Sequence, residues 1–139
     1  MPNESILDTN VVIEFCGQRA PFFDAAAEII DMAKRGEIDL VISSLSFVNA
    51  AYVLRKQFER HTLDMKLCQL MDLCKVSKVD GDMIKAAINR QSYDFEDCVQ
   101  FMSAKSRKAD VVITRDQKGF ADLDLYYMTA DEFVRKCQE

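Results

Sequence analysis

Short strand-like runs alternate along this chain with longer stretches of helical periodicity, and this alternation limits the fold more than any other feature. The runs are ESILD at 4–8, DLVIS at 39–43, KVSKVD at 75–80, DVVIT at 110–114 and LDLYYM at 123–128. DVVIT is almost continuously apolar, which is typical of a strand covered on both faces. Because helices separate the strands, we expect parallel pairing through right-handed crossovers. The sequence therefore predicts a three-layer α/β/α fold with a four- or five-stranded, mainly parallel sheet.

The helical stretches have recognisable ends. Gly36 stands in a C-cap position after one of them, Asp94 is a suitable N-cap, and Thr129 with Glu132 has the spacing of a capping box. We expect helices over about 10–16, 22–35, 46–58, 62–73, 81–90 and 94–107, and a last helix after Thr129.

Length and composition narrow the class of protein. A chain of 139 residues can bury a core without disulfides, so we expect one domain over residues 1–139. No apolar run approaches the roughly 18 residues of a membrane span, and the first residues lack a signal-peptide pattern, which favours a cytoplasmic protein with no membrane partner. The formal charge of −5 argues against a protein that coats DNA. The five cysteines include no CxxC pair, which favours reduced thiols over disulfides or zinc.

Carboxylates stand where the predicted strands end. Asp8 follows the first strand and Asp116 follows the fourth, while Asp97 lies about one turn into the helix that Asp94 opens. Functional crevices of such sheets lie at the carboxyl ends of the strands, so Asp8, Asp97 and Asp116 can converge there. Gathered carboxylates repel one another unless a cation is present. Oxygen ligands without clustered His or Cys suit Mg²⁺ or Mn²⁺.

Each of these acids also has a purely structural interpretation. Asp94 is a good N-cap by itself, and Asp97 gains from the dipole of the same helix. Asp8 and Asp116 can each cap the turn that follows a strand. Spacing alone does not decide between a metal site and a set of caps.

Four segments occur in an order that resembles a known family. They are ILDTNVVIEF at 6–15, SSLSFVNAAYVL at 43–54, DFEDCVQFMSA at 94–104 and VVITRDQKGF at 111–120. Together they resemble the PIN-domain ribonucleases, especially the VapC-like toxins of type II toxin–antitoxin modules. The resemblance implies a PIN-like fold in which carboxylates hold Mg²⁺ or Mn²⁺ and metal-activated water hydrolyses an RNA phosphodiester.

The resemblance also implies roles for particular residues. Asp8, Asp97 and Asp116 match the family's first, third and fourth acids and would be catalytic metal ligands. Thr114 matches the family's Ser or Thr at the strand end and would orient a ligand or the attacking water. The family's second acid, usually Glu, falls at Asn49, which is a departure from the pattern.

Asn49 brings no charge to the site that the resemblance implies. Its side-chain oxygen can still ligate a metal or bind water at the edge of the site. Asp94 is expected to supply a further carboxylate to the metal in place of the missing acid.

The leading expectation is a metal-dependent endoribonuclease that acts on RNA as the toxin of a toxin–antitoxin pair. Its expected partners are a cognate antitoxin protein and a second copy of the chain in a homodimer. The alternative is a degenerate PIN-like module that binds RNA or a protein partner without cleavage. A ribonuclease that uses two imidazoles is excluded, because His61 is the only histidine. A receiver-like phosphoacceptor is disfavoured, because YYMTAD at 126–131 lacks the lysine expected after its last strand.

Overall fold

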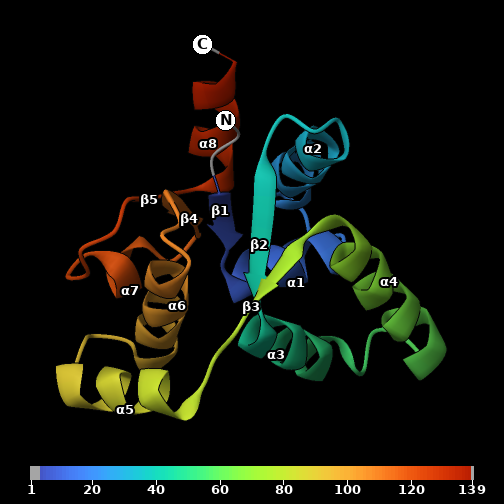
Figure 1. The fold of residues 1–139 in the computed structure, drawn as a ribbon. Helices are drawn as coiled ribbons and strands as arrows, with labels where there is room; N and C mark the ends of the chain where they lie inside the picture. The colour runs from blue at the N-terminus through green and yellow to red at the C-terminus, as the bar shows by residue number, and fades with distance from the viewer. Residues whose placement is uncertain (1–3, 139) are drawn as a thin grey trace.

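A computed structural model describes residues 4–138 and contains the predicted alternation of strands and helices (Figure 1). Within these residues, no helix combines the length and apolar character needed to cross a membrane. The elements are β1 (Glu4–Leu7), α1 (Thr9–Cys16), α2 (Phe23–Lys34), β2 (Asp39–Ser43), α3 (Ser44–Leu54), α4 (Arg60–Leu73), β3 (Lys75–Ser77), α5 (Gly81–Arg90), α6 (Phe95–Ser106), β4 (Val111–Ile113), α7 (Gln117–Phe120), β5 (Tyr127–Met128) and α8 (Ala130–Cys137).

The five strands form one sheet in the order β3-β2-β1-β4-β5, so β1 lies at its centre. Ser5 of β1 is paired with Leu40 of β2 on one side and with Val111 of β4 on the other. Every pair of neighbouring strands is parallel, as helical crossovers require. The expected α/β fold with a parallel sheet is confirmed.

Helices cover both faces of the sheet, because successive residues of a strand point to opposite sides. Leu7 and Ile113 belong to a core cluster shared with α1, α2, α3, α4 and α8. Ile6 and Val112, one residue earlier in each strand, belong to a second cluster shared with α5, α6 and α7. Figure 1 shows α5, α6 and α7 gathered on the opposite side of the sheet from α2 and α4. The arrangement confirms the three predicted layers.

The last strand is shorter than the sequence predicts. The strand expected over 123–128 is limited to Tyr127–Met128. Leu123 is buried, but it lies in a turn where its amide donates to the carbonyl of Phe120. Its apolar side chain packs into the second core cluster from a loop, so the apolar run overstates the length of the strand.

Two helical boundaries also differ from the prediction. The helix expected over 46–58 is α3, which ends earlier, at Leu54, and also begins earlier because the Ser43 hydroxyl caps it by accepting a hydrogen bond from the amide of Ser46 at 3.1 Å. The short helix α7 was not predicted, and it begins where the Asp116 carboxylate accepts a hydrogen bond from the amide of Gly119 at 3.2 Å. In both cases a side-chain cap fixes the start of the helix.

The topology brings several helix starts to one edge of the sheet. One residue separates β1 from α1, α3 begins directly after β2, and three residues separate the end of β4 at Ile113 from the start of α7. α6 returns toward the amino end of β4, so its first turn lies at the same carboxyl edge (Figure 1). The acids that the sequence singles out stand at or just before these helix starts.

Candidate active site

A pocket of about 340 Å³ opens at the carboxyl edge of the sheet. It brings together four segments that are distant in sequence: the start of α1, the middle of α3, the start of α6 and the turn before α7. Five of the residues that line it carry a carboxylate, and no Lys or Arg of residues 4–138 is among them. The lining residues are Asp8, Thr9, Asn10, Ile13, Asn49, Tyr52, Val53, Asp94, Glu96, Asp97 and Asp116.

Asp8 lies at the floor of the site, where only 2% of its surface is exposed. Its carboxylate accepts hydrogen bonds from the amide of Thr9 at 2.8 Å, from Asn10 Nδ2 at 3.1 Å and from Thr114 Oγ1 at 2.8 Å. Burial raises the pKa of Asp8 to about 6. Asp8 therefore caps α1, as the structural interpretation expects, and also faces the acidic pocket.

Thr114 connects two of the acids without lining the pocket itself. Its buried hydroxyl donates to Asp8 Oδ2 and accepts a hydrogen bond from the amide of Asp116 at 2.9 Å. A threonine at the end of β4 thus fixes one carboxylate through its side chain and the other through its backbone. Its place in the structure is that of a residue that holds Asp8 and Asp116 in position.

Asp97 is a buried acid of the pocket whose carboxylate lacks a hydrogen-bond donor on one oxygen among residues 4–138. It is 3% exposed, and its Oδ2 atom has no hydrogen-bond partner within the described residues. Burial, together with the charges of Asp8, Asp116 and Asp94, raises the pKa of Asp97 to about 9. A buried oxygen without a donor costs free energy unless another group, such as a cation, satisfies it.

Asp94, Asp97 and Asp116 each offer a carboxylate oxygen within 4.8 Å of the other two. Two ligands of one Mg²⁺ ion lie at most about 4.2 Å apart, given Mg–O distances of about 2.1 Å. Small side-chain movements would therefore close these oxygens around one ion. An oxygen-only set of donors with an unsatisfied buried member fits Mg²⁺ or Mn²⁺. Asp8 lies in the same pocket but outside this closest group of three.

Gly119 makes room for this arrangement. A Cβ atom at Gly119 would lie 1.6 Å from Asp97 Oδ2 and 3.0 Å from Asp116 Oδ2. The first distance is far too short and the second is tight, so any side chain at position 119 would force the Asp97 carboxylate or its surroundings to move. No local sequence pattern indicates this contact, because it joins residues from two helices that are distant in the sequence.

Glu96 is a site residue that sequence reasoning missed. It was visible between Asp94 and Asp97, but the resemblance assigns no role to it. In the structure it lines the pocket, and Asn49 Nδ2 donates a hydrogen bond to Glu96 Oε2. Burial and the charge of Asp94 raise the pKa of Glu96, although the bond from Asn49 works in the opposite direction. Asn49 thus faces the site, as expected, but it contacts another acid.

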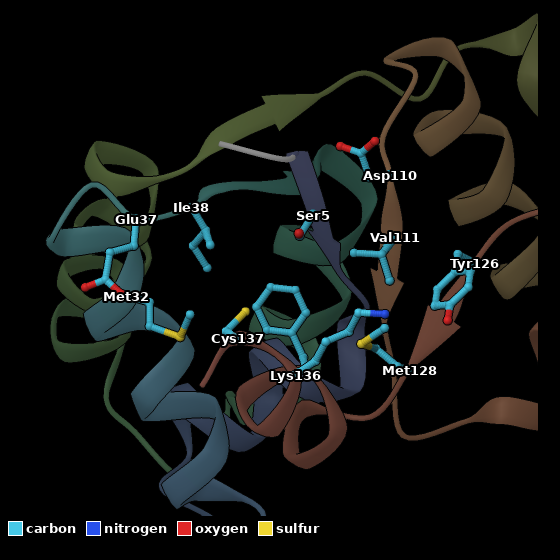
Figure 2. A pocket seen from close by; sticks show the side chains of 11 residues that line it. Ser5, Met32, Glu37, Ile38, Asp110, Val111, Tyr126, Met128, Lys136 and Cys137 are labelled. Carbon is cyan, nitrogen blue, oxygen red and sulfur yellow. The ribbon is translucent and has the colours of Figure 1, made fainter. Parts of the chain in front are cut away.

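A larger cavity, of about 570 Å³, lies at the opposite edge of the sheet. Figure 2 shows its lining, with Ser5, Val111 and Met128 from the sheet and Lys136 from α8. Its two carboxylates, Glu37 and Asp110, stand on opposite sides of it (Figure 2). Because its acids do not converge, size alone does not make this cavity the better candidate for metal chemistry.

Comparison with known proteins identifies the class to which this fold and site belong. The PIN domain family profile matches residues 4–118, so the chain belongs to the PIN domain family. Comparison with curated protein sequences gives no match.

Solved structures with a similar fold include toxins of the VapBC type. DNA-bound VapBC from Salmonella typhimurium aligns with a TM-score of 0.69 at 18% identity, covering 94% of this chain and 99% of that chain. A toxin–antitoxin complex from Klebsiella pneumoniae gives 0.67 at 19% identity, covering 91% and 97%. VapC20 from Mycobacterium tuberculosis, described as a sarcin-ricin loop cleaving toxin, gives 0.67 at 11% identity, covering 84% and 93%. At these identities the likeness shows the fold alone.

Proposed function

We propose that this protein is a metal-dependent endoribonuclease and the toxin of a toxin–antitoxin pair. The observation that carries the proposal is the acidic pocket, in which Asp97 buries an oxygen without a hydrogen-bond donor. Membership of the PIN domain family and the fold of VapC toxins support a nuclease. A single domain over residues 1–139 and a cytoplasmic location are part of this proposal.

The residues divide into metal ligands and residues that position them. Asp97, Asp116 and Asp94 offer the nearest group of oxygens, and Asp8 faces them across the pocket. A bound Mg²⁺ or Mn²⁺ would supply a Lewis acid that polarises the scissile phosphate and lowers the pKa of water. The Thr114 hydroxyl positions both acids, because it donates a hydrogen bond to Asp8 and accepts one from the amide of Asp116.

RNA is the proposed substrate, and Arg115, next to Asp116 in the sequence, is suited to a flanking phosphate. Arg115 precedes Asp116, and its amide donates to Asn10 Oδ1 at 3.3 Å. Its guanidinium forms an ion pair with the buried Glu14 at 2.5 Å and lies over the ring of Phe22. These contacts hold a half-exposed cation beside an acidic pocket, where a phosphate chain needs a positive contact.

A cognate antitoxin and a homodimer are the proposed protein partners. The structures from Salmonella typhimurium and Klebsiella pneumoniae are toxin–antitoxin complexes, which supports an antitoxin here. Val48, Tyr52 and Val53 of α3 are exposed apolar side chains, and the last two line the pocket. An apolar rim beside an acidic site suits a partner segment that covers the site with apolar and basic side chains.

Cleavage of a structured RNA under metal control tests the proposed activity. The parent protein, stripped of metal, should cut only after Mg²⁺ or Mn²⁺ is added, and Asp97→Asn should lower the rate by on the order of a hundredfold. The exposed variant Asp64→Asn, on α4, is the matched control and should cut as the parent does. Equal cleavage by the parent in excess EDTA and in Mg²⁺ would contradict the proposal.

The alternative of a binding-only PIN-like module has one observation in its favour, the uncharged Asn49 at the position of the family's second acid. Such a module should bind RNA with similar affinity whether or not metal is present and should leave the RNA intact. Gel-shift and cleavage measurements on the same samples separate the two functions.

A further inference from the structure

Asn49 and Glu96, which lie on two different helices, contact each other in the pocket. Asn49 lies on α3 and Glu96 in the first turn of α6, and Asn49 Nδ2 donates its hydrogen bond to Glu96 Oε2. The contact joins the position at which the family's second acid falls to an acid with no assigned role. Both side chains line the pocket that contains Asp8 and Asp97.

The charge of Glu96 acts on the rest of the site. The negative charge of Glu96 contributes to the raised pKa of the neighbouring Asp8 carboxyl. Glu96 is itself only partly exposed, and among the described residues the pocket lining offers it no Lys or Arg. Glu96 lies among other carboxylates, and a single neutral amide is a weak partner for its negative charge. The charge of Glu96 is therefore balanced only when a cation is bound.

A second observation supports a cation in the same pocket. Asp97 Oδ2 is buried without a hydrogen-bond partner among residues 4–138, and the residue is 3% exposed. An unsatisfied buried oxygen of this kind distinguishes the pocket from a cluster of surface acids and suits a positively charged ligand. Asn49 donates to Oε2 of Glu96, and within residues 4–138 no bond is made to Oε1, which leaves that atom for the cation.

We infer that Glu96 takes the place of the acid that other family members carry at position 49, and that Asn49 positions it. The acid would therefore come from α6 in place of α3. The amide that orients the acid comes from α3. The inference rests on the metal site of the proposed function but does not require that the protein cuts RNA.

Calorimetric titration of Mn²⁺ into the metal-stripped full chain at pH 7 tests this exchange. Glu96→Gln should weaken Mn²⁺ binding by about tenfold or more, and Asn49→Ala should weaken it by a smaller factor because the carboxylate remains but loses its support. The double variant Asn49→Glu with Glu96→Gln should restore affinity to within about threefold of the parent, since the new amide at position 96 can donate to the new carboxylate at position 49. Glu28→Gln, on the exposed side of α2, is the matched control and should bind as the parent does.

Several outcomes would overturn the inference. They are parent-like Mn²⁺ affinity in Glu96→Gln, failure of the double variant to regain affinity, and a parent that binds no Mn²⁺. Thermal melting in EDTA checks the fold, and Glu96→Gln should melt at or above the parent temperature because one repelling charge is removed. If Glu96→Gln did not fold, parent-like affinity in Asn49→Ala would overturn the inference by itself. A parent that binds Mn²⁺, follows the exchange pattern and cuts no RNA would contradict the proposed function alone.

Discussion

At the scale of single residues, the acidic pocket opposes folding when no cation is bound. Asp97 has a pKa of about 9 and Asp8 a pKa of about 6, both well above the usual value of 3.8. Burial is the main cause for each, and the neighbouring carboxylates add to it. The metal-free folded protein therefore holds protons at these positions that the unfolded chain releases, and this difference makes stability depend on pH.

The pH dependence of unfolding should have a definite sign. Between about pH 4 and pH 9 the folded state binds more protons at Asp97 than the unfolded state does, so the free energy of unfolding should fall as pH rises. The slope from one such group is at most about 1.4 kcal/mol per pH unit. Urea unfolding in EDTA across this range measures it, and Asp97→Asn should flatten the slope because Asn does not titrate. Excess Mg²⁺ should flatten it in the parent, since the ion binds the charged carboxylates. A parent whose stability rises from pH 5 to pH 8 in EDTA would contradict these pKa shifts.

Gly119→Ala tests whether the close packing of Gly119 against Asp97 leaves room for a side chain at position 119. The added Cβ would meet Asp97 Oδ2 at 1.6 Å, so the Asp97 side chain must rotate or the two helices must move apart. We expect a loss of about 1–3 kcal/mol in the free energy of unfolding and a large loss of Mn²⁺ affinity. Gly81→Ala is the matched control, because nothing lies within 4 Å of its added Cβ, and it should leave both quantities close to those of the parent. Parent-like stability and Mn²⁺ affinity in Gly119→Ala would contradict the close packing of Gly119 against Asp97.

At the scale of helices, capping and site formation use the same side chains. Asp8 caps α1, Asp94 caps α6 and Asp116 caps α7. The structural interpretation of each acid was therefore accurate, but it does not compete with the functional one. A carboxylate that accepts one amide hydrogen bond keeps further lone pairs for another ligand. The caps also fix where each carboxylate points.

Two N-caps of the same chemistry separate the capping role from the metal-binding role. Asp94 accepts from the amide of Asp97 at 2.9 Å, and Asp80 accepts from the amide of Met83 at 3.0 Å at the start of α5. Asp80→Ala should cost about 0.5–2 kcal/mol of stability in EDTA, and Asp94→Ala should cost less because it also removes a repelling charge. Only Asp94→Ala should weaken Mn²⁺ binding, by about tenfold or more. Equal Mn²⁺ affinity in the two variants would remove Asp94 from the ligand set.

At the scale of the whole molecule, the alternation of strands and helices was enough to predict the parallel sheet and its layers. The edge at which the site lies followed from that topology, because parallel strands place their carboxyl ends together. The short β5 and the helix α7 could not be predicted, since Leu123 is buried by packing from a loop and α7 depends on a single side-chain cap. Local sequence does not encode such tertiary contacts.

The site was predicted in part. Asp8, Asp94, Asp97 and Asp116 were singled out as strand-end or helix-start acids, and the structure brings all four into one pocket. The contribution of Glu96 depends on a contact with α3 that spans 47 residues of sequence. Only the folded arrangement reveals that Asn49 and an acid from another helix occupy one wall.

The ends of the RNA products test the central claim, that water is activated in the carboxylate pocket, most directly. Hydrolysis by water should leave a 5′-phosphate and a 3′-hydroxyl, because the nucleophile is not part of the RNA. Attack by the RNA's own 2′-hydroxyl would leave a 2′,3′-cyclic phosphate, and a pair of imidazoles to catalyse that attack is excluded because His61 is the only histidine. With Mg²⁺ and the parent protein we predict 5′-phosphate and 3′-hydroxyl ends. Cyclic phosphate ends would contradict the account.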